Sequence, residues 1–200
     1  FGGKMRRAKI DRRTKETKIR LELDLDGIGS YNINTPIPFL NHMLELVAKF
    51  SCIDLKIKAS GNIHIDDHHT TEDLGICLGQ AIKKALGKKE SIFRYGFSTV
   101  PMDEALSEIS LDLSNRPFLI FNVNFRRERK KRAEFDFELI EDFFRALCVN
   151  AGITVHINLR YGRNSHHIAE SIFKGFGVAL REAAKVNPRL KGVPSTKGRL

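Results

Sequence analysis

The second half of this chain repeats the order of elements that its first half predicts. The two matching segments are FLNHMLELVAKFSCIDLKIKASGNIHIDDHHTTEDLGICLGQAI, residues 39–82, and ELIEDFFRALCVNAGITVHINLRYGRNSHHIAESIFKGFGVAL, residues 138–180. Each segment predicts an amphipathic helix, an alternating strand, a polar stretch, the pattern His-His-x-x-Glu and a second helix. A repeat of roughly half the chain predicts a duplicated fold.

The repeat extends upstream of these segments. KETKIRLELDLDG, residues 15–27, and DEALSEISLDLSN, residues 103–115, both place a glutamate before an alternating strand, so Glu16 and Glu104 occupy equivalent positions. Each half is then approximately strand, strand, helix, strand, helix. Because each sheet needs helices over one face, we expect one α+β unit with the helices packed between two sheets.

The composition is that of an ordinary globular protein. The chain has 200 residues, of which 42% are hydrophobic and 29% charged, and no apolar run reaches the roughly 20 residues that cross a bilayer. The three cysteines, Cys52, Cys77 and Cys148, are an odd number in unrelated contexts. They predict buried thiols in a reducing compartment and no disulfide framework, so we expect a cytoplasmic protein without a membrane partner.

The net charge of +10 allows two kinds of anionic partner, nucleic acid or small phosphate esters. Much of the charge lies in RRERKKR, residues 126–132, for which we expect a solvated turn between a strand and a helix. This run has no aromatic residue that could stack on a base, which argues against single-strand binding. We therefore expect a small phosphate ligand and no nucleic acid.

The same metal-ligating pattern occurs twice, as HHTTE at residues 68–72 and HHIAE at residues 166–170. If each pattern begins a helix, its first histidine and its glutamate lie on one face and can share an ion. The second histidine points about 100° away around the helix axis. Each pattern therefore offers two coordination directions, which implies two metals.

The repeat also predicts how the ligands are divided between the two metals. One site would take His68, Glu72 and His167, and the other His166, Glu170 and His69. His42, on the preceding helix, is the candidate fourth ligand of the second site. Aligning Ile53 with Ile153 places Asp142 opposite His42, so pseudo-symmetry predicts Asp142 at the first site. The alternative for Asp142 is a solvent-exposed residue at the start of a helix.

Imidazole and carboxylate ligands without a thiolate suit manganese, iron, zinc or cobalt. Octahedral coordination would leave two positions on each metal for water or substrate. Asp66 and Asp67 directly precede the first pattern, and we expect them to cap the helix or to orient the imidazoles.

A phosphate group could be bound by several cationic and hydroxyl side chains. The candidates are Arg94, Arg116, Lys174, Ser195, Thr196 and Lys197. Lys174 lies one helical turn beyond Glu170 and can face the metal site. Taken singly, each candidate is more typical of a surface residue.

Three long segments together resemble one known family. Residues 39–81, residues 101–117 (PMDEALSEISLDLSNRP) and residues 162–183 (GRNSHHIAESIFKGFGVALREA) are similar to imidazoleglycerol-phosphate dehydratase along nearly the whole chain. The resemblance implies dehydration of imidazole glycerol phosphate to imidazole acetol phosphate in L-histidine biosynthesis, without a redox cofactor. The expected route passes through a metal-stabilised imidazolate and a diazafulvene-like intermediate.

The resemblance also implies site residues, including two manganese(II) ions per active site. The family's ligand pattern falls on His42, His69, His166 and Glu170 for one ion, and on His68, Glu72 and His167 for the other. The fourth ligand of the latter is a histidine in the best-known forms, and here that position is Asp142. Substrate contacts fall on Glu16, Arg94, Arg116, Lys174, Ser195 and Lys197, with Glu16 as the general acid/base.

The fold implied by the resemblance is a duplicated α+β unit with two four-stranded sheets and left-handed βαβ crossovers. Residues 5–90 and 91–187 would be the half-repeats, and residues 188–200 a substrate-binding tail. The family forms a shell of two dozen chains with active sites at subunit interfaces, so we expect a homo-oligomer.

Two other functions stay open at this point. A dinuclear metallohydrolase would usually have a bridging carboxylate, and no such residue stands out. A basic nucleic-acid-binding module with structural metals is disfavoured because the predicted metals keep open coordination positions.

Overall fold

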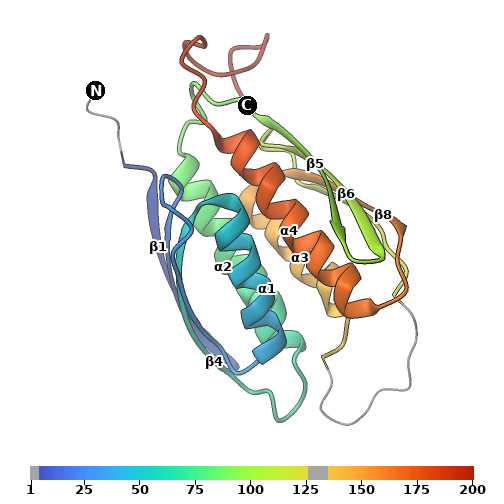
Figure 1. The fold of residues 1–200 in the computed structure, drawn as a ribbon. Coiled ribbons are helices and arrows are strands. Elements are labelled where there is room, and N and C mark those ends of the chain that lie inside the picture. Colours follow the sequence, from blue (N-terminus) through green and yellow to red (C-terminus); the bar gives the residue numbers. More distant parts are fainter. Residues whose placement is uncertain (1–4, 126–134) are drawn as a thin grey trace.

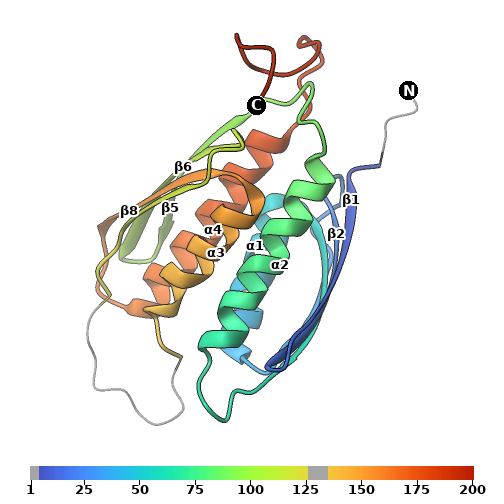
Figure 2. The same cartoon turned by 180° about the vertical axis from the view of Figure 1, so that it is seen from behind.

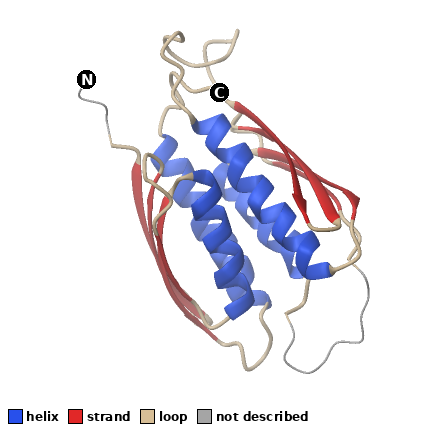
Figure 3. Cartoon of the chain, viewed as in Figure 1, coloured by secondary structure: helices blue, strands red, loops and turns tan. Residues whose placement is uncertain are grey.

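Each half of the chain forms one sheet and two helices. The computed structural model describes residues 5–125 and 135–200, so the basic run at 126–132 lies outside the described residues. The first half contributes β1 (Arg7–Arg13), β2 (Thr17–Asp24), β3 (Tyr31–Asn34), α1 (Pro38–Ser51), β4 (Asp54–Gly61) and α2 (His68–Leu86). The second contributes β5 (Tyr95–Met102), β6 (Ala105–Asp112), β7 (Phe118–Asn122), α3 (Leu139–Ala151), β8 (Thr154–Tyr161) and α4 (Ser165–Ala184). The helices lie between the two sheets, as predicted (Figure 1, Figure 3).

The two sheets share one topology, which confirms the duplication. Their strand orders are β1-β2-β4-β3 and β5-β6-β8-β7. In the first sheet β2 is antiparallel to β1 and β4, whereas β3 is parallel to β4 and connected to it through α1. The second sheet repeats this arrangement with β7, α3 and β8. The left-handedness of these βαβ connections stays a prediction.

The order of elements predicted from periodicity was one strand short in each half. The missing strands are β3 (YNIN) and β7 (FLIFN), which lie at the edge of each sheet. Neither strand contains a buried residue, so neither has the alternation of buried and exposed side chains that makes a strand recognisable.

Alternating side chains explain why the helices cover only one face of each sheet. In β2, Ile19, Leu21 and Leu23 are buried and the residues between them are charged. The helices cover this inner face and bury their own apolar stripes, including Phe143 and Phe173. Each such side chain contributes roughly 1.5–3 kcal/mol by leaving water.

The helices pair across the two halves. α2 packs against α3, and α1 packs against α4. Two glycines of α2 allow this approach, because a Cβ on Gly75 would lie 2.5 Å from the backbone oxygen of Phe143, and one on Gly79 2.6 Å from that of Leu147. The first helix of each half therefore lies beside the second helix of the other half.

All four helices begin at the same end of the molecule, opposite to the start of β1 and to the C-terminal tail (Figure 1, Figure 2). Oδ1 of Asp66 accepts the backbone N–H of His68, and Oδ1 of Asn164 accepts those of His166 and His167. The capping predicted for Asp66 is thus confirmed. Capping is wrong for Asp67, whose side chain makes no cap hydrogen bond among the described residues, and its other expected role, orienting the imidazoles, stays a prediction. In residues 5–125 and 135–200, no helix is long and apolar enough to span a membrane.

Candidate metal centre and anion cavity

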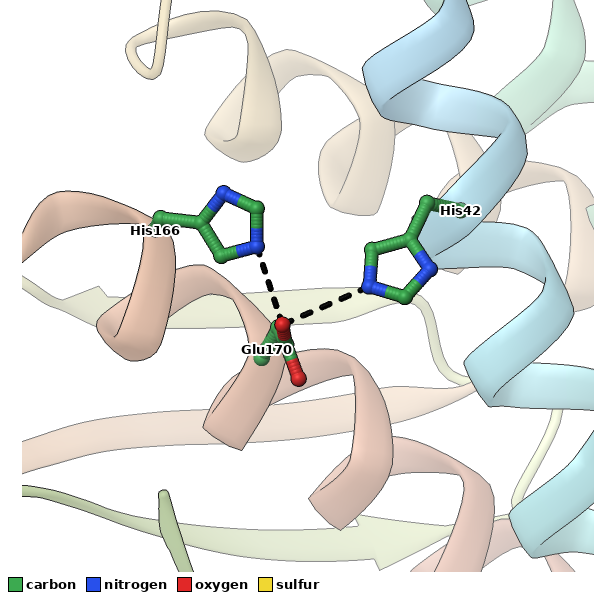
Figure 4. A group of neighbouring side chains, drawn as sticks. All are labelled: His42, His166 and Glu170. Carbon is green, nitrogen blue, oxygen red and sulfur yellow. Dashed lines mark hydrogen bonds and ion pairs between the residues drawn. The ribbon is translucent and has the colours of Figure 1, made fainter. Parts of the chain in front are cut away.

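Three side chains from two helices converge near the start of α4. Nε2 of His166 lies 2.9 Å from Oε1 of Glu170, and Nε2 of His42, from α1, lies 3.3 Å from the same oxygen. The three ligand atoms lie within 4.8 Å of one another, and Figure 4 shows both imidazoles directed at that carboxylate. Two imidazole nitrogens and a carboxylate at this spacing could hold a divalent transition metal.

Glu170 is the buried member of this cluster, with only 10% of its side chain exposed. Burial by itself raises the pKa of Glu170, but hydrogen bonds with Lys174, His42 and His166 outweigh it and lower the pKa to about 2. Nζ of Lys174 lies 2.7 Å from Oε2 of Glu170, one helical turn away as predicted. The carboxylate is therefore ionised, which a metal ligand must be.

The pseudo-equivalent cluster is more open. Nε2 of His68 lies 3.9 Å from Oε2 of Glu72, and Nδ1 of His68 lies 3.9 Å from Oδ2 of Asp142, on α3. These side chains are each at least 40% exposed, and the distances are too long for hydrogen bonds. Asp142 thus lies beside His68. This is the location expected from the alignment of the repeats, in which Asp142 is the equivalent of His42.

The second histidine of each pattern points away from both clusters, toward a glutamate. Nδ1 of His69 lies 3.7 Å from Oε2 of Glu16, and Nδ1 of His167 lies 2.6 Å from Oε2 of Glu104. One chain therefore does not bring His69 to the His42 cluster, nor His167 to the His68 cluster. Those two groupings, predicted from the repeat, need ligands from another copy if they form.

The contact between Glu104 and His167 changes the pKa values of both side chains. The hydrogen bond with His167 lowers the pKa of Glu104 to about 2, and the same bond raises the pKa of His167. Oε1 of Glu104 also accepts the backbone N–H groups of Arg163 at 3.1 Å and Asn164 at 2.7 Å.

Most of the predicted phosphate ligands line one cavity of about 940 Å³ at the other end of the molecule. Those lining it are Arg94, Arg116, Ser195, Thr196 and Lys197. Lys174 is not among them, because it lies beside Glu170.

Arg94 joins the wall of this cavity to the tail. It makes two hydrogen bonds to Asp112, at 2.8 and 3.1 Å, and a third to the backbone oxygen of Pro194 at 2.9 Å. Its hydrogen bond to Asp112 raises its pKa. Arg116 also approaches Asp112, at 3.4 Å, but 69% of its side chain is exposed. Of these two arginines, Arg116 is therefore the one that is open to a ligand.

The group His42, His166 and Glu170, called the metal cluster below, lies far from the cavity lined by Arg94 and Arg116, called the anion cavity. The N–H of Arg94 donates to the backbone oxygen of Ala183, close to the end of α4, whereas Glu170 lies in its second turn. With 1.5 Å of rise per residue, these two positions are separated by about 20 Å along the helix.

Comparison with known proteins identifies the family. A sequence model described as imidazoleglycerol-phosphate dehydratase matches residues 35–180. The chain belongs to the imidazoleglycerol-phosphate dehydratase family. The dehydratase of Methylorubrum populi is 54% identical over 98% of this chain and 100% of its own length. That of Clostridium acetobutylicum is 53% identical over 96% of this chain and 97% of its own length.

Solved dehydratase structures have the same fold. The Staphylococcus aureus dehydratase covers 90% of this chain and 99% of its own, with a TM-score of 0.81 at 40% identity. The Pyrococcus furiosus dehydratase covers 96% of this chain and 100% of its own, with a TM-score of 0.82 at 37% identity. The fold class and the family inferred from the sequence are therefore confirmed.

Sequence reasoning missed two residues of this dehydratase chain that contact candidate site residues. Glu104 was aligned with Glu16 but received no role, although the repeat already placed it before an HHxxE pattern. Asp112, which contacts both Arg94 and Arg116, carried no signal because an acidic residue at the end of a strand is common.

Proposed function

We propose that this chain dehydrates imidazole glycerol phosphate to imidazole acetol phosphate in L-histidine biosynthesis, using two manganese(II) ions per active site. The supporting observation is the convergence of His42, His166 and Glu170, in a chain of the dehydratase family. Cys77 and Cys148 are buried as predicted, whereas Cys52 is only half-buried because it lies at the end of α1. All three thiols are free, which is compatible with the cytoplasm, where we place the chain.

The donor groups fit such ions. Imidazole nitrogens and carboxylate oxygens are ligands that manganese accepts, and no thiolate is present in either cluster. Nδ1 of His69 is buried and has no hydrogen-bond partner among the described residues. Because Nδ1 is buried and faces Glu16 at 3.7 Å, Nε2 is the nitrogen of this ring that would bind a metal.

The distance along α4 supports an active site shared between copies. A substrate of this size is shorter than the roughly 20 Å between the metal cluster and the anion cavity of one chain. One substrate can therefore meet both only if they come from different copies. We propose a homo-oligomer, with 24 chains as in the family, in which His69 and His167 complete metal sites that another chain begins. The tail, residues 188–200, would then close over substrate held by a neighbour.

The reaction removes a C–H proton and the hydroxyl of the adjacent carbon as water, and the resulting enol tautomerises to the ketone. Bound divalent ions would stabilise negative charge on the imidazole ring while the proton leaves. Glu16, half exposed beside His69, would move that proton as the general acid/base. Arg116, Ser195, Thr196 and Lys197 would bind the phosphate, and Arg94 would hold the tail at Pro194. Lys174 would contact substrate near Glu170.

Metal removal and reconstitution test the proposal. Chelated protein should lose dehydratase activity and recover it with manganese(II), whereas Glu72→Gln should lose at least about 100-fold in kcat. The exposed Glu90→Gln is the control. No recovery with manganese, or full activity in Glu72→Gln, contradicts the proposal.

A metal count tests Asp142 separately. Asp142→Ala should retain less manganese per chain than wild type after dialysis against limiting metal, whereas Asp142→His should retain the wild-type amount. Equal metal content in Asp142→Ala and wild type would show that Asp142 is not a ligand.

A further inference from the structure

We infer that Glu104 is a positioning residue, which fixes His167 in the tautomer that leaves Nε2 free to bind a metal. This inference rests on the proposed metal site and assigns a task to a residue outside its ligand set. Glu16 and Glu104, which the duplication placed at equivalent positions, differ in how their carboxylates are held.

Both oxygens of Glu104 are held in place. Oε1 accepts the N–H groups of Arg163 and Asn164 at 3.1 and 2.7 Å, and Oε2 lies 2.6 Å from Nδ1 of His167. Three short contacts leave this carboxylate one orientation. Because an ionised carboxylate only accepts hydrogen bonds, Nδ1 of His167 must carry the proton. Nε2 then keeps its lone pair, as a metal ligand must.

Among the described residues, the Glu16 side chain has no such anchor. Its Oε2 lies 3.7 Å from Nδ1 of His69, beyond hydrogen-bond distance, and half of its side chain is exposed. The difference follows from loop length. The second half joins β8 to α4 through residues 162–164 only, and the backbone of this short loop reaches Glu104. The first half uses the longer loop 62–67 between β4 and α2.

The two glutamates therefore diverged in task. Glu16 kept a free carboxylate that can exchange a proton with substrate. The carboxylate of Glu104 is fully used by the protein and cannot also act on substrate. Glu104 therefore affects the metal site only by orienting the imidazole of His167.

Glu104→Gln separates this role from simple helix capping. If the new amide oxygen accepts from Arg163 and Asn164, its NH2 group faces Nδ1 of His167 and donates to it. Nε2 then carries the proton and cannot bind a metal. If the amide is reversed, its NH2 group meets two N–H donors. The variant keeps the cap only by reversing the tautomer of His167.

The test is a titration of manganese(II) into metal-free protein, followed by the electron paramagnetic resonance signal of the free ion. Glu104→Gln should weaken one class of site roughly 10–100-fold, the usual effect of losing a partner of a metal-bound histidine. Glu108→Gln, in strand β6 directly after Glu104 and paired with Arg160, should bind like wild type. Excess manganese should restore dehydratase turnover to Glu104→Gln but not to Glu16→Gln.

A double-mutant cycle with His167→Ala protects the test against a folding defect. In that background, Glu104→Gln should have no further effect on manganese affinity, because its effect passes through His167. Wild-type affinity in Glu104→Gln, or an equal loss in the His167→Ala background, overturns the inference. If wild-type protein binds no manganese, the proposed function fails instead.

Discussion

The contrast between Glu170 and its pseudo-equivalent Glu72 shows how far two copies of one sequence pattern can differ. Glu170 is buried, paired with Lys174 and ionised, whereas Glu72 is exposed and 3.9 Å from its nearest partner, His68. Lys174 explains part of this difference, because the equivalent residue in the first half is Ile76, which cannot form an ion pair with Glu72. The side chains of the His42 cluster therefore lie close enough to share an ion, whereas those of the His68 cluster lie further apart.

Lys89 is a second residue whose environment has a measurable consequence. Its side chain is almost fully buried, and Nζ donates to Oδ1 of Asn115 at 2.8 Å. Burial lowers the pKa of Lys89 from 10.5 to about 8. Asn115 lines the anion cavity, so the hydrogen bond from Lys89 holds part of the cavity wall in place.

The pKa of Lys89 predicts a pH-dependent cost of burial. Between pH 8 and 10.5 the unfolded chain binds a proton at Lys89 that the folded chain has released, so folded stability rises with pH in that window. The free energy of unfolding of wild type, measured relative to that of Lys89→Met, should therefore rise by up to about 3 kcal/mol between pH 7 and pH 10.5. Urea unfolding of both proteins at the two pH values measures this. The exposed Lys88→Met should show no such change, and an unchanged difference for Lys89→Met would refute the prediction.

At the scale of elements, the close contact of α2 with α3 determines whether Asp142 can reach His68. Gly75 and Gly79 face the backbone of α3 at distances where no Cβ fits. The corresponding contact in the other helix pair involves Gly177, whose Cβ would lie 3.0 Å from the backbone oxygen of Val47.

Gly75→Ala should separate α2 from α3. Because the added methyl group meets the backbone of Phe143, we expect a loss of roughly 1–3 kcal/mol in the free energy of unfolding. Manganese affinity at the His68 cluster should fall, while the His42 cluster on α1 and α4 should be unaffected. Lys83→Ala, on the exposed face of the same helix, controls for helix propensity. Chemical denaturation and manganese titration check both parts, and an unaltered stability would show that the helices yield without cost.

At the scale of the whole molecule, the separation of metal cluster and anion cavity predicts complementation between inactive variants. Glu170→Gln should damage the metal cluster and Arg116→Ala the anion cavity, each lowering activity sharply. When the two variants are refolded together in equal amounts, about a quarter of the shared sites should combine an intact cluster with an intact cavity.

Dehydratase assays of the mixed assembly measure this rescue. Each variant refolded alone provides the baseline, and wild type refolded in the same way provides the maximum. Activity that never exceeds the mean of the two variants would mean that one chain supplies both parts of its own site.

The sequence by itself determined the duplication, the sandwich of helices between sheets, the HHxxE patterns and the equivalence of Glu16 with Glu104. These follow from spacing along the chain, since helical and strand periodicities place side chains on defined faces of a single element. Only the tertiary structure decided which helices meet. Packing of α1 against α4 and of α2 against α3 directs His42 to Glu170 and Asp142 to His68. It also sends His69 and His167 toward glutamates and places the tail far from the metal cluster. Such pairings arise from closing one core around contacts distant in sequence, for which local periodicity carries no signal.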